Sequence, residues 1–96
     1  MAAGDAYVVA PTSTANNASL TLAQGSGVEV VVHNIYYGGA VEFYWTDGTN
    51  PIKFDSDTAL GGRLNLQHHC TQTRYISIKN VSGGTIFIGA DGMTTR

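Results

Sequence analysis

The chain has 96 residues, of which 12% are charged, and its formal net charge at pH 7 is −2. This length predicts one domain, and the lack of a basic cluster gives no electrostatic footprint for nucleic acid. Uncharged polar residues and glycine replace charged residues in this composition. Because such a surface repels little, we expect it to tolerate close packing against copies of itself or a partner.

Short segments of alternating apolar and polar residues begin near the N-terminus. A first strand is predicted over residues 6–10, and Pro11 ends it. Residues 11–19 are small, polar and uncharged, which indicates a loop or an extended arm with nothing to bury. The chain is therefore divided into an N-terminal strand and flexible arm, residues 1–19, and a β-sandwich domain, residues 20–96.

Further strands follow at regular intervals and are separated by turns rich in glycine or by Asp-Gly pairs. The predicted strands are residues 20–22, 28–35, 41–46, 52–54, 64–66, 75–80 and 86–88. Many short strands with such punctuation indicate a sandwich or barrel. We predict an all-β fold: a small antiparallel β-sandwich, jelly-roll-like, with seven to eight short strands. Jelly-roll and immunoglobulin-like pairing orders share this pattern.

Alternation places one side of each strand in a common core, because successive side chains point to opposite faces. The predicted core comprises Leu20, Leu22, Val28, Val30, Val32, Val41, Phe43, Trp45, Ile52, Phe54, Leu64, Leu66, Ile76, Ile78, Ile86 and Ile88.

A second apolar set lies on the opposite faces of the same strands or beside a turn. Its members are Val31, Ile35, Tyr36, Tyr37, Tyr44, Tyr75 and Phe87. Exposed apolar area of this extent marks an interaction surface, and aromatic side chains dominate such contacts. We therefore predict that these residues form the interface of a homo-oligomer.

His68, His69 and Cys70 are the only adjacent residues that resemble metal ligands, with His33 elsewhere. Neighbouring side chains on a strand point to opposite faces, so His68 and His69 do not share an ion, and a zinc site needs three or four converging ligands. Cys70 has no base at a spacing that suggests a nucleophile. No metal site and no cofactor are predicted.

Two pairs of carboxylates have arrangements that occur in metal or catalytic sites. Asp55 and Asp57 have a spacing that could chelate calcium, but the full calcium loop pattern is absent and an Asp-x-Asp turn usually caps backbone amides. Glu29 and Glu42 each lie opposite core residues on their strands, which favours a solvated face over a glycosidase pair. The chain is predicted not to be an enzyme.

Residues 1–10 lack the pattern of a signal peptide, and the longest apolar run, residues 30–32, is too short to span a membrane. The single cysteine excludes an internal disulfide. We expect synthesis in a cytoplasm and no membrane partner.

Two segments carry a resemblance to a known class of proteins. Residues 41–49 form an aromatic strand with an Asp-Gly turn, and residues 74–84 form an Ile-x-Ile strand that ends in Ser-Gly-Gly. Together they resemble small jelly-roll-like virion proteins of tailed bacteriophages, including capsid decoration (cement) proteins and short head-fibre or tail modules. The likeness covers most of residues 20–92.

The resemblance implies a structural role on the outer capsid surface of a virion. Copies of the chain, typically trimers, would bind the major capsid protein or another virion protein and stabilise the phage head. The alternative class is a carbohydrate- or receptor-binding β-sandwich of a phage tail or surface protein.

Overall fold

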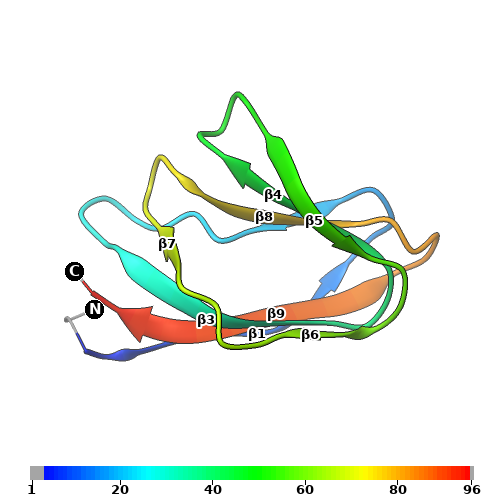
Figure 1. Ribbon diagram of the computed structural model, residues 1–96, viewed down its shortest axis with the longest axis horizontal. Helices are drawn as coiled ribbons and strands as arrows, with labels where there is room; N and C mark the ends of the chain where they lie inside the picture. Colours follow the sequence, from blue (N-terminus) through cyan, green and yellow to red (C-terminus); the bar gives the residue numbers. More distant parts are fainter. Residues whose placement is uncertain (1–3, 96) are drawn as a thin grey trace.

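Nine strands make up two antiparallel sheets in the computed structural model, which describes residues 4–95 (Figure 1). The strands are β1 (Ala6–Thr14), β2 (Ser19–Thr21), β3 (Val30–Tyr37), β4 (Val41–Thr46), β5 (Ile52–Asp57), β6 (Gly61–Arg63), β7 (His68–Cys70), β8 (Tyr75–Asn80) and β9 (Ile86–Thr94). No helix among these residues has the length and apolar character needed to cross a membrane.

The strand order identifies a jelly-roll-like sandwich. Sheet A has the order β1-β9-β3-β6, with β7 also paired to β3, and sheet B has the order β2-β8-β4-β5. Except at the β4–β5 hairpin and between β6 and β7, the chain crosses to the other sheet at each connection. This alternation is how a double-sheet jelly roll places sequence neighbours in opposite layers. The predicted all-β sandwich class is confirmed.

The N-terminal segment that was predicted as a short strand followed by an arm forms a longer strand. β1 pairs with β9 along its length, with a β-bulge between Val9 and Thr12. Pro11 lies in this bulge on the edge strand of sheet A, where the missing amide hydrogen of proline costs no ladder hydrogen bond. The strand therefore continues to Thr14, and residues 1–3 of the predicted arm lie outside the described residues.

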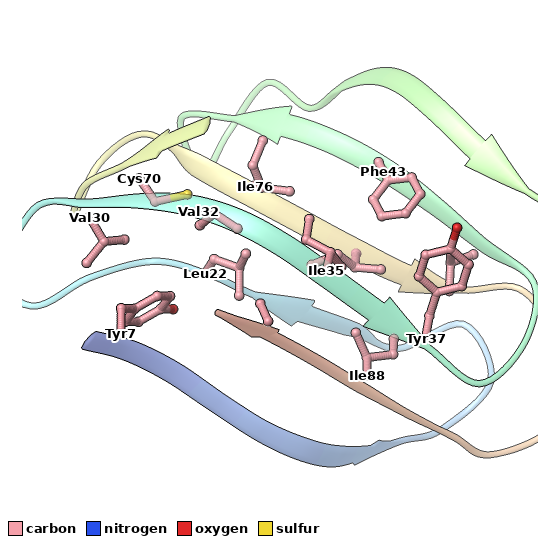
Figure 2. Close-up of a cluster of buried hydrophobic side chains, with 13 residues drawn as sticks. Tyr7, Leu22, Val30, Val32, Ile35, Tyr37, Phe43, Cys70, Ile76 and Ile88 are labelled. Atoms are coloured by element: carbon pink, nitrogen blue, oxygen red, sulfur yellow. The ribbon is translucent and has the colours of Figure 1, made fainter. Parts of the chain in front are cut away.

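The core lies between the two sheets and is mostly aliphatic, with aromatic side chains at its ends (Figure 2). Its buried members are Tyr7, Leu22, Val30, Val32, Ile35, Tyr37, Val41, Phe43, Cys70, Ile76, Ile78, Ile88 and Ala90. Tyr37 packs edge-on against Phe43, with ring centroids 5.5 Å apart. Of the remaining predicted core residues, Leu20, Val28, Leu66 and Ile86 are partly buried against this cluster.

A bulge in β3 overturns two predicted surface positions. The register with β9 shifts between Val32 and Asn34, so the inward face changes from Val30 and Val32 to Ile35 and Tyr37. An extra residue in a strand reverses which side chains face the core. Ile35 is 1% exposed and Tyr37 is 4% exposed, so their prediction as exposed interface anchors is wrong.

Four predicted core residues are exposed instead: Trp45, Ile52, Phe54 and Leu64. The first three belong to the β4–β5 hairpin, whose turn rises away from sheet A (Figure 1), so sheet A covers them only in part, by way of His68 of β7 against Phe54. Leu64 lies between β6 and β7, on the segment that interrupts their pairing with β3. Alternation marks which face of a strand an apolar residue occupies, but it does not show whether an opposing sheet reaches that face.

Candidate functional site

A hollow of about 380 Å³ lies on the outer face of sheet A, and we name it the Gly89 hollow. Outward residues of β9 recur every second position, here Phe87, Gly89 and Asp91. Gly89 has no side chain, and Tyr36 lies directly opposite it on β3. The position is restricted to glycine because a Cβ atom there would lie 2.9 Å from the Val9 carbonyl oxygen in the β1 bulge.

The walls of the Gly89 hollow differ in character. Phe87 and Val8 are 61% and 70% exposed, and Tyr36 is 45% exposed. The bulged residues Ala10 and Pro11 complete the apolar lining on the β1 side. Asp91 supplies the charged group of the hollow, beside Val8 in the β1 register.

Both carboxylate oxygens of Asp91 accept hydrogen bonds. Asn34 Nδ2 donates to Oδ1 at 2.6 Å and the Tyr36 hydroxyl donates to Oδ2 at 3.1 Å. The hydrogen bond to Asp91 raises the pKa of Tyr36, since it favours the protonated phenol. The ion pairs within residues 4–95 involve other carboxylates, so no described cation neutralises Asp91.

A second apolar surface, named here the open edge, consists of Trp45, Ile52 and Phe54. Trp45 pairs with Ile52 on one side and with the fully buried Ile76 on the other, so it lies on the inward face of sheet B. The three side chains are nevertheless 41%, 57% and 44% exposed. Phe54 sits at a β5 bulge, and its ring centroid lies 5.3 Å from that of His68.

Next to the open edge, an ionic cluster joins the two sheets, and we name it the Arg63 bridge. Arg63 of β6 pairs with Asp55 at 2.8 Å and with Asp57 at 3.3 Å, both on β5. Its guanidinium also lies 5.6 Å from the centre of the Phe43 ring. The Tyr37 hydroxyl donates to Asp57 at 2.6 Å and accepts from Arg63 Nη1 at 3.0 Å.

The Arg63 bridge shifts the titration of its members. The hydrogen bond from Arg63 lowers the pKa of Asp55, and the hydrogen bond from Tyr37 lowers the pKa of Asp57. Burial and the hydrogen bond to Asp57 raise the pKa of Tyr37 to about 12. Both carboxylates are therefore ionised at neutral pH and bind a cation of the chain itself, which leaves them unsuited to the calcium role considered above.

The outer face of sheet B is polar. A groove of about 470 Å³ there is lined by hydroxyl side chains of β2, β4 and β8 and by Tyr44, Tyr75 and Lys79. The Tyr44 hydroxyl donates to Glu42 at 2.6 Å, and Lys53 pairs with Glu42 at 3.0 Å. These hydrogen bonds lower the pKa of Glu42.

Strand alternation in β7 places His68 and Cys70 on the inward face and His69 on the outer face. His68 packs against Phe54, and burial lowers the pKa of its ring. His69 is exposed, and Cys70 is fully buried. Burial also raises the pKa of the Cys70 thiol, which keeps it protonated and unreactive at neutral pH. No group of three metal-ligating residues converges within residues 4–95.

The predicted interface residues do not form one surface. Tyr36 and Phe87 line the Gly89 hollow, and Val31 pairs with Met93 elsewhere in sheet A. Tyr44 and Tyr75 line the groove on sheet B. Whether any of the five contacts another chain stays a prediction.

The parts of the hollow and of the open edge that depend on tertiary structure are not predicted from the sequence. The strand that ends at residue 88 in our prediction continues to Thr94, and a period of two along it places Gly89 and Asp91 on the face of Phe87. For Trp45 and Ile52 the sequence carries no such signal, because an inward apolar residue has the same pattern whether or not a facing sheet covers it.

Comparison with solved structures supports the fold. Structures similar to this chain include the core of Drosophila NLP, which was described in terms of pentamer formation and histone binding. The match has a TM-score of 0.52 at 14% sequence identity and covers 95% of this chain and 98% of that chain. At this identity the likeness shows a common fold alone. No protein-family model and no curated protein sequence matches the chain.

This comparison overturns the resemblance to virion proteins of tailed bacteriophages. The similar structure is the core of a Drosophila protein, so the capsid decoration role and the alternative of a tail or surface module are wrong, and the capsid partner loses its basis. Residues 41–49 and 74–84 encode strands and tight turns. Any small sandwich needs these features, so the two segments are not specific to virion proteins.

Proposed function

We propose that this chain is a non-catalytic subunit that associates with copies of itself through the open edge. One observation carries the proposal: three large apolar side chains face inward from sheet B and remain 41–57% exposed. Covering such a surface lowers the free energy of the chain by removing apolar area from water. A second copy of the chain is a partner that is always present.

The energetic argument favours a closed assembly over a single contact. Fully burying a large apolar side chain contributes roughly 1.5–3 kcal/mol, so completing the burial of three half-exposed residues contributes a few kcal/mol per contact at most. Closed symmetry repeats that contact at every interface. The low charge of the chain, a net −2 over 96 residues, limits repulsion between copies.

The fold comparison supports self-association, since the Drosophila core of similar fold was described as forming pentamers. The resemblance stated above implied a trimer. The proposal concerns the contact surface, and the number of copies follows from the mass of the assembly, three or five times the 10.1 kDa chain.

The absence of catalysis is part of the proposal. Cys70 is buried and protonated, and the carboxylates with lowered pKa values are hydrogen-bonded within the chain. Asp55 and Asp57 are engaged by Arg63, and Glu42 by Tyr44 and Lys53. No cofactor is proposed.

The test is the solution mass, measured by light scattering after size exclusion over a range of concentrations. The tested variant combines Trp45→Ser and Ile52→Ser. Because the fold leaves much of both side chains exposed, we expect this variant to fold. Because the apolar contact surface is removed, we expect it to have the mass of a monomer. The matched control combines Val8→Ser and Phe87→Ser on sheet A, where both side chains are more exposed than Trp45 and Ile52, and should leave the mass of the assembly unchanged.

Trp45 gives a second readout because it is the only tryptophan. Its emission should move to shorter wavelength as concentration rises and association covers the ring. A monomeric wild-type chain at all concentrations would contradict the proposal. Dissociation by the control pair instead of the edge pair would place the contact on the outer face of sheet A.

A further inference from the structure

The Gly89 hollow has the geometry of a side-chain receptor rather than of a flat contact. Gly89 lies between Phe87 and Asp91 at the floor of the hollow, and Tyr36 lines the β3 side. The β1 bulge at Ala10 and Pro11 closes the opposite side. The volume of the hollow beside this bulge, about 380 Å³, admits one unbranched side chain.

Charge and apolarity are separated within the hollow. The aromatic and aliphatic walls bind a methylene chain, whereas the carboxylate of Asp91 attracts a positive group. Asn34 and Tyr36 hold that carboxylate in place at 2.6 Å and 3.1 Å. The aromatic rings of Tyr36 and Phe87 add attraction for a cation placed over their faces.

We propose that the Gly89 hollow binds a lysine side chain presented by a partner protein. Lysine buries its four-carbon stem along apolar surface while its ammonium group remains at a polar site, which matches the apolar walls and the single carboxylate. The net charge of −2 favours a basic partner over another copy of this chain. Two of the chain's own cations, Arg63 and Lys53, are already paired with carboxylates. The inference goes beyond self-association and does not depend on it.

The test uses the side chain alone. N-acetyl-lysine methylamide is titrated into the ¹⁵N-labelled full chain, and the amide signals of Gly89 and Asp91 report on the hollow by NMR. The matched ligand is the norleucine derivative, which has the same apolar stem without the ammonium group. We expect saturable shifts with the lysine derivative in the millimolar range and binding about fivefold weaker for the norleucine derivative, the scale of one partly exposed ion pair.

Two variants distinguish the contribution of the Asp91 charge to binding from that of the apolar walls. Asp91→Asn should weaken lysine binding about fivefold and leave norleucine binding unchanged. Phe87→Ala should weaken both ligands, because it removes part of the apolar wall. Asp47→Asn, which removes the same charge from the β4–β5 turn, serves as the control and should change neither ligand's affinity.

Three outcomes would overturn the inference. These are equal binding of both ligands to the wild type, equal loss with Asp91→Asn and Asp47→Asn, and the absence of shifts at Gly89 throughout the titration. Solution mass is measured on the same samples. Binding at the hollow in a monomeric chain would support this inference while contradicting self-association, so the two proposals fail separately.

Discussion

At the scale of single residues, Asn80 is a buried polar side chain that makes three hydrogen bonds to the backbone. Its side chain is 0% exposed. Nδ2 donates to the carbonyl oxygens of Thr14 at 2.8 Å and Gly84 at 2.6 Å, and Oδ1 accepts from the Ser82 amide at 2.9 Å. One amide therefore joins β8 to β1 of the other sheet and to the turn that leads into β9.

Asn80→Ala should destabilise the chain by about 2–4 kcal/mol, because it removes the buried donor to the Thr14 carbonyl oxygen and also the hydrogen bonds to Gly84 and Ser82. Urea unfolding measures the free energy of unfolding. The control is Asn16→Ala, which removes one exposed hydrogen bond to the Gly83 amide and should cost less than about 1 kcal/mol. Equal effects of the two substitutions would show that the buried contacts of Asn80 are not the source of stability.

At the scale of elements, β9 is an inner strand of sheet A and is packed too closely for a side chain at Gly92. β9 pairs with β1 on one side and β3 on the other. Gly92 pairs with Val32 beside the β3 bulge, and a Cβ atom there would overlap the Val31 carbonyl oxygen. The bulge that turns Ile35 and Tyr37 inward thus requires glycine on the neighbouring strand.

Gly92→Ala should destabilise the chain by about 2–4 kcal/mol, because backbone atoms of β3 have to move. The matched control is Gly84→Ala, since a Cβ atom at Gly84 meets nothing within 4 Å and its φ angle is not in the left-handed region. Thermal unfolding followed by circular dichroism compares the two. A Gly92→Ala chain as stable as the control would mean that β3 and β9 tolerate a wider spacing than the structure has.

At the scale of the whole molecule, the Arg63 bridge joins sheet A to sheet B beside the open edge and couples their packing to pH. Asp55 and Asp57 have pKa values below the ordinary 3.8 in the folded chain. A lowered folded-state pKa stabilises the fold above the unfolded value, and this contribution is lost as pH falls through the folded value. The bridge should therefore weaken in acid, below about pH 4.

Arg63→Gln should lower the free energy of unfolding at pH 7, and the difference from wild type should shrink as the pH approaches 3. Denaturant unfolding at several pH values measures this difference. A difference independent of pH would assign the role of Arg63 to its packing over Phe43, 5.6 Å from the ring centre, rather than to the carboxylates.

The sequence by itself determined the fold class, the approximate positions of the central strands and part of the core. Alternation identified Val41 and Phe43 in β4 and Ile76 and Ile78 in β8 as buried, because their strands keep a regular period of two to the end of the pairing. The sequence also predicted the Asp47-Gly48 turn, in which Asp47 Oδ1 accepts hydrogen bonds from the amides of Thr49 and Asn50 at 2.9 and 2.8 Å. These features depend on local chemistry and on a repeated pattern.

Only the tertiary structure decided which residues form the candidate sites. Single-residue bulges reversed the facing of Ile35 and Tyr37 and brought Pro11 opposite Gly89, and no alternation rule locates a bulge. The exposure of Trp45 and Ile52 depends on how far sheet A extends beneath the β4–β5 hairpin. The Gly89 hollow likewise combines strands that are distant in the chain. Local sequence indicates on which face of a strand a side chain lies. Contacts between strands that are distant in the chain decide whether that face is buried or exposed.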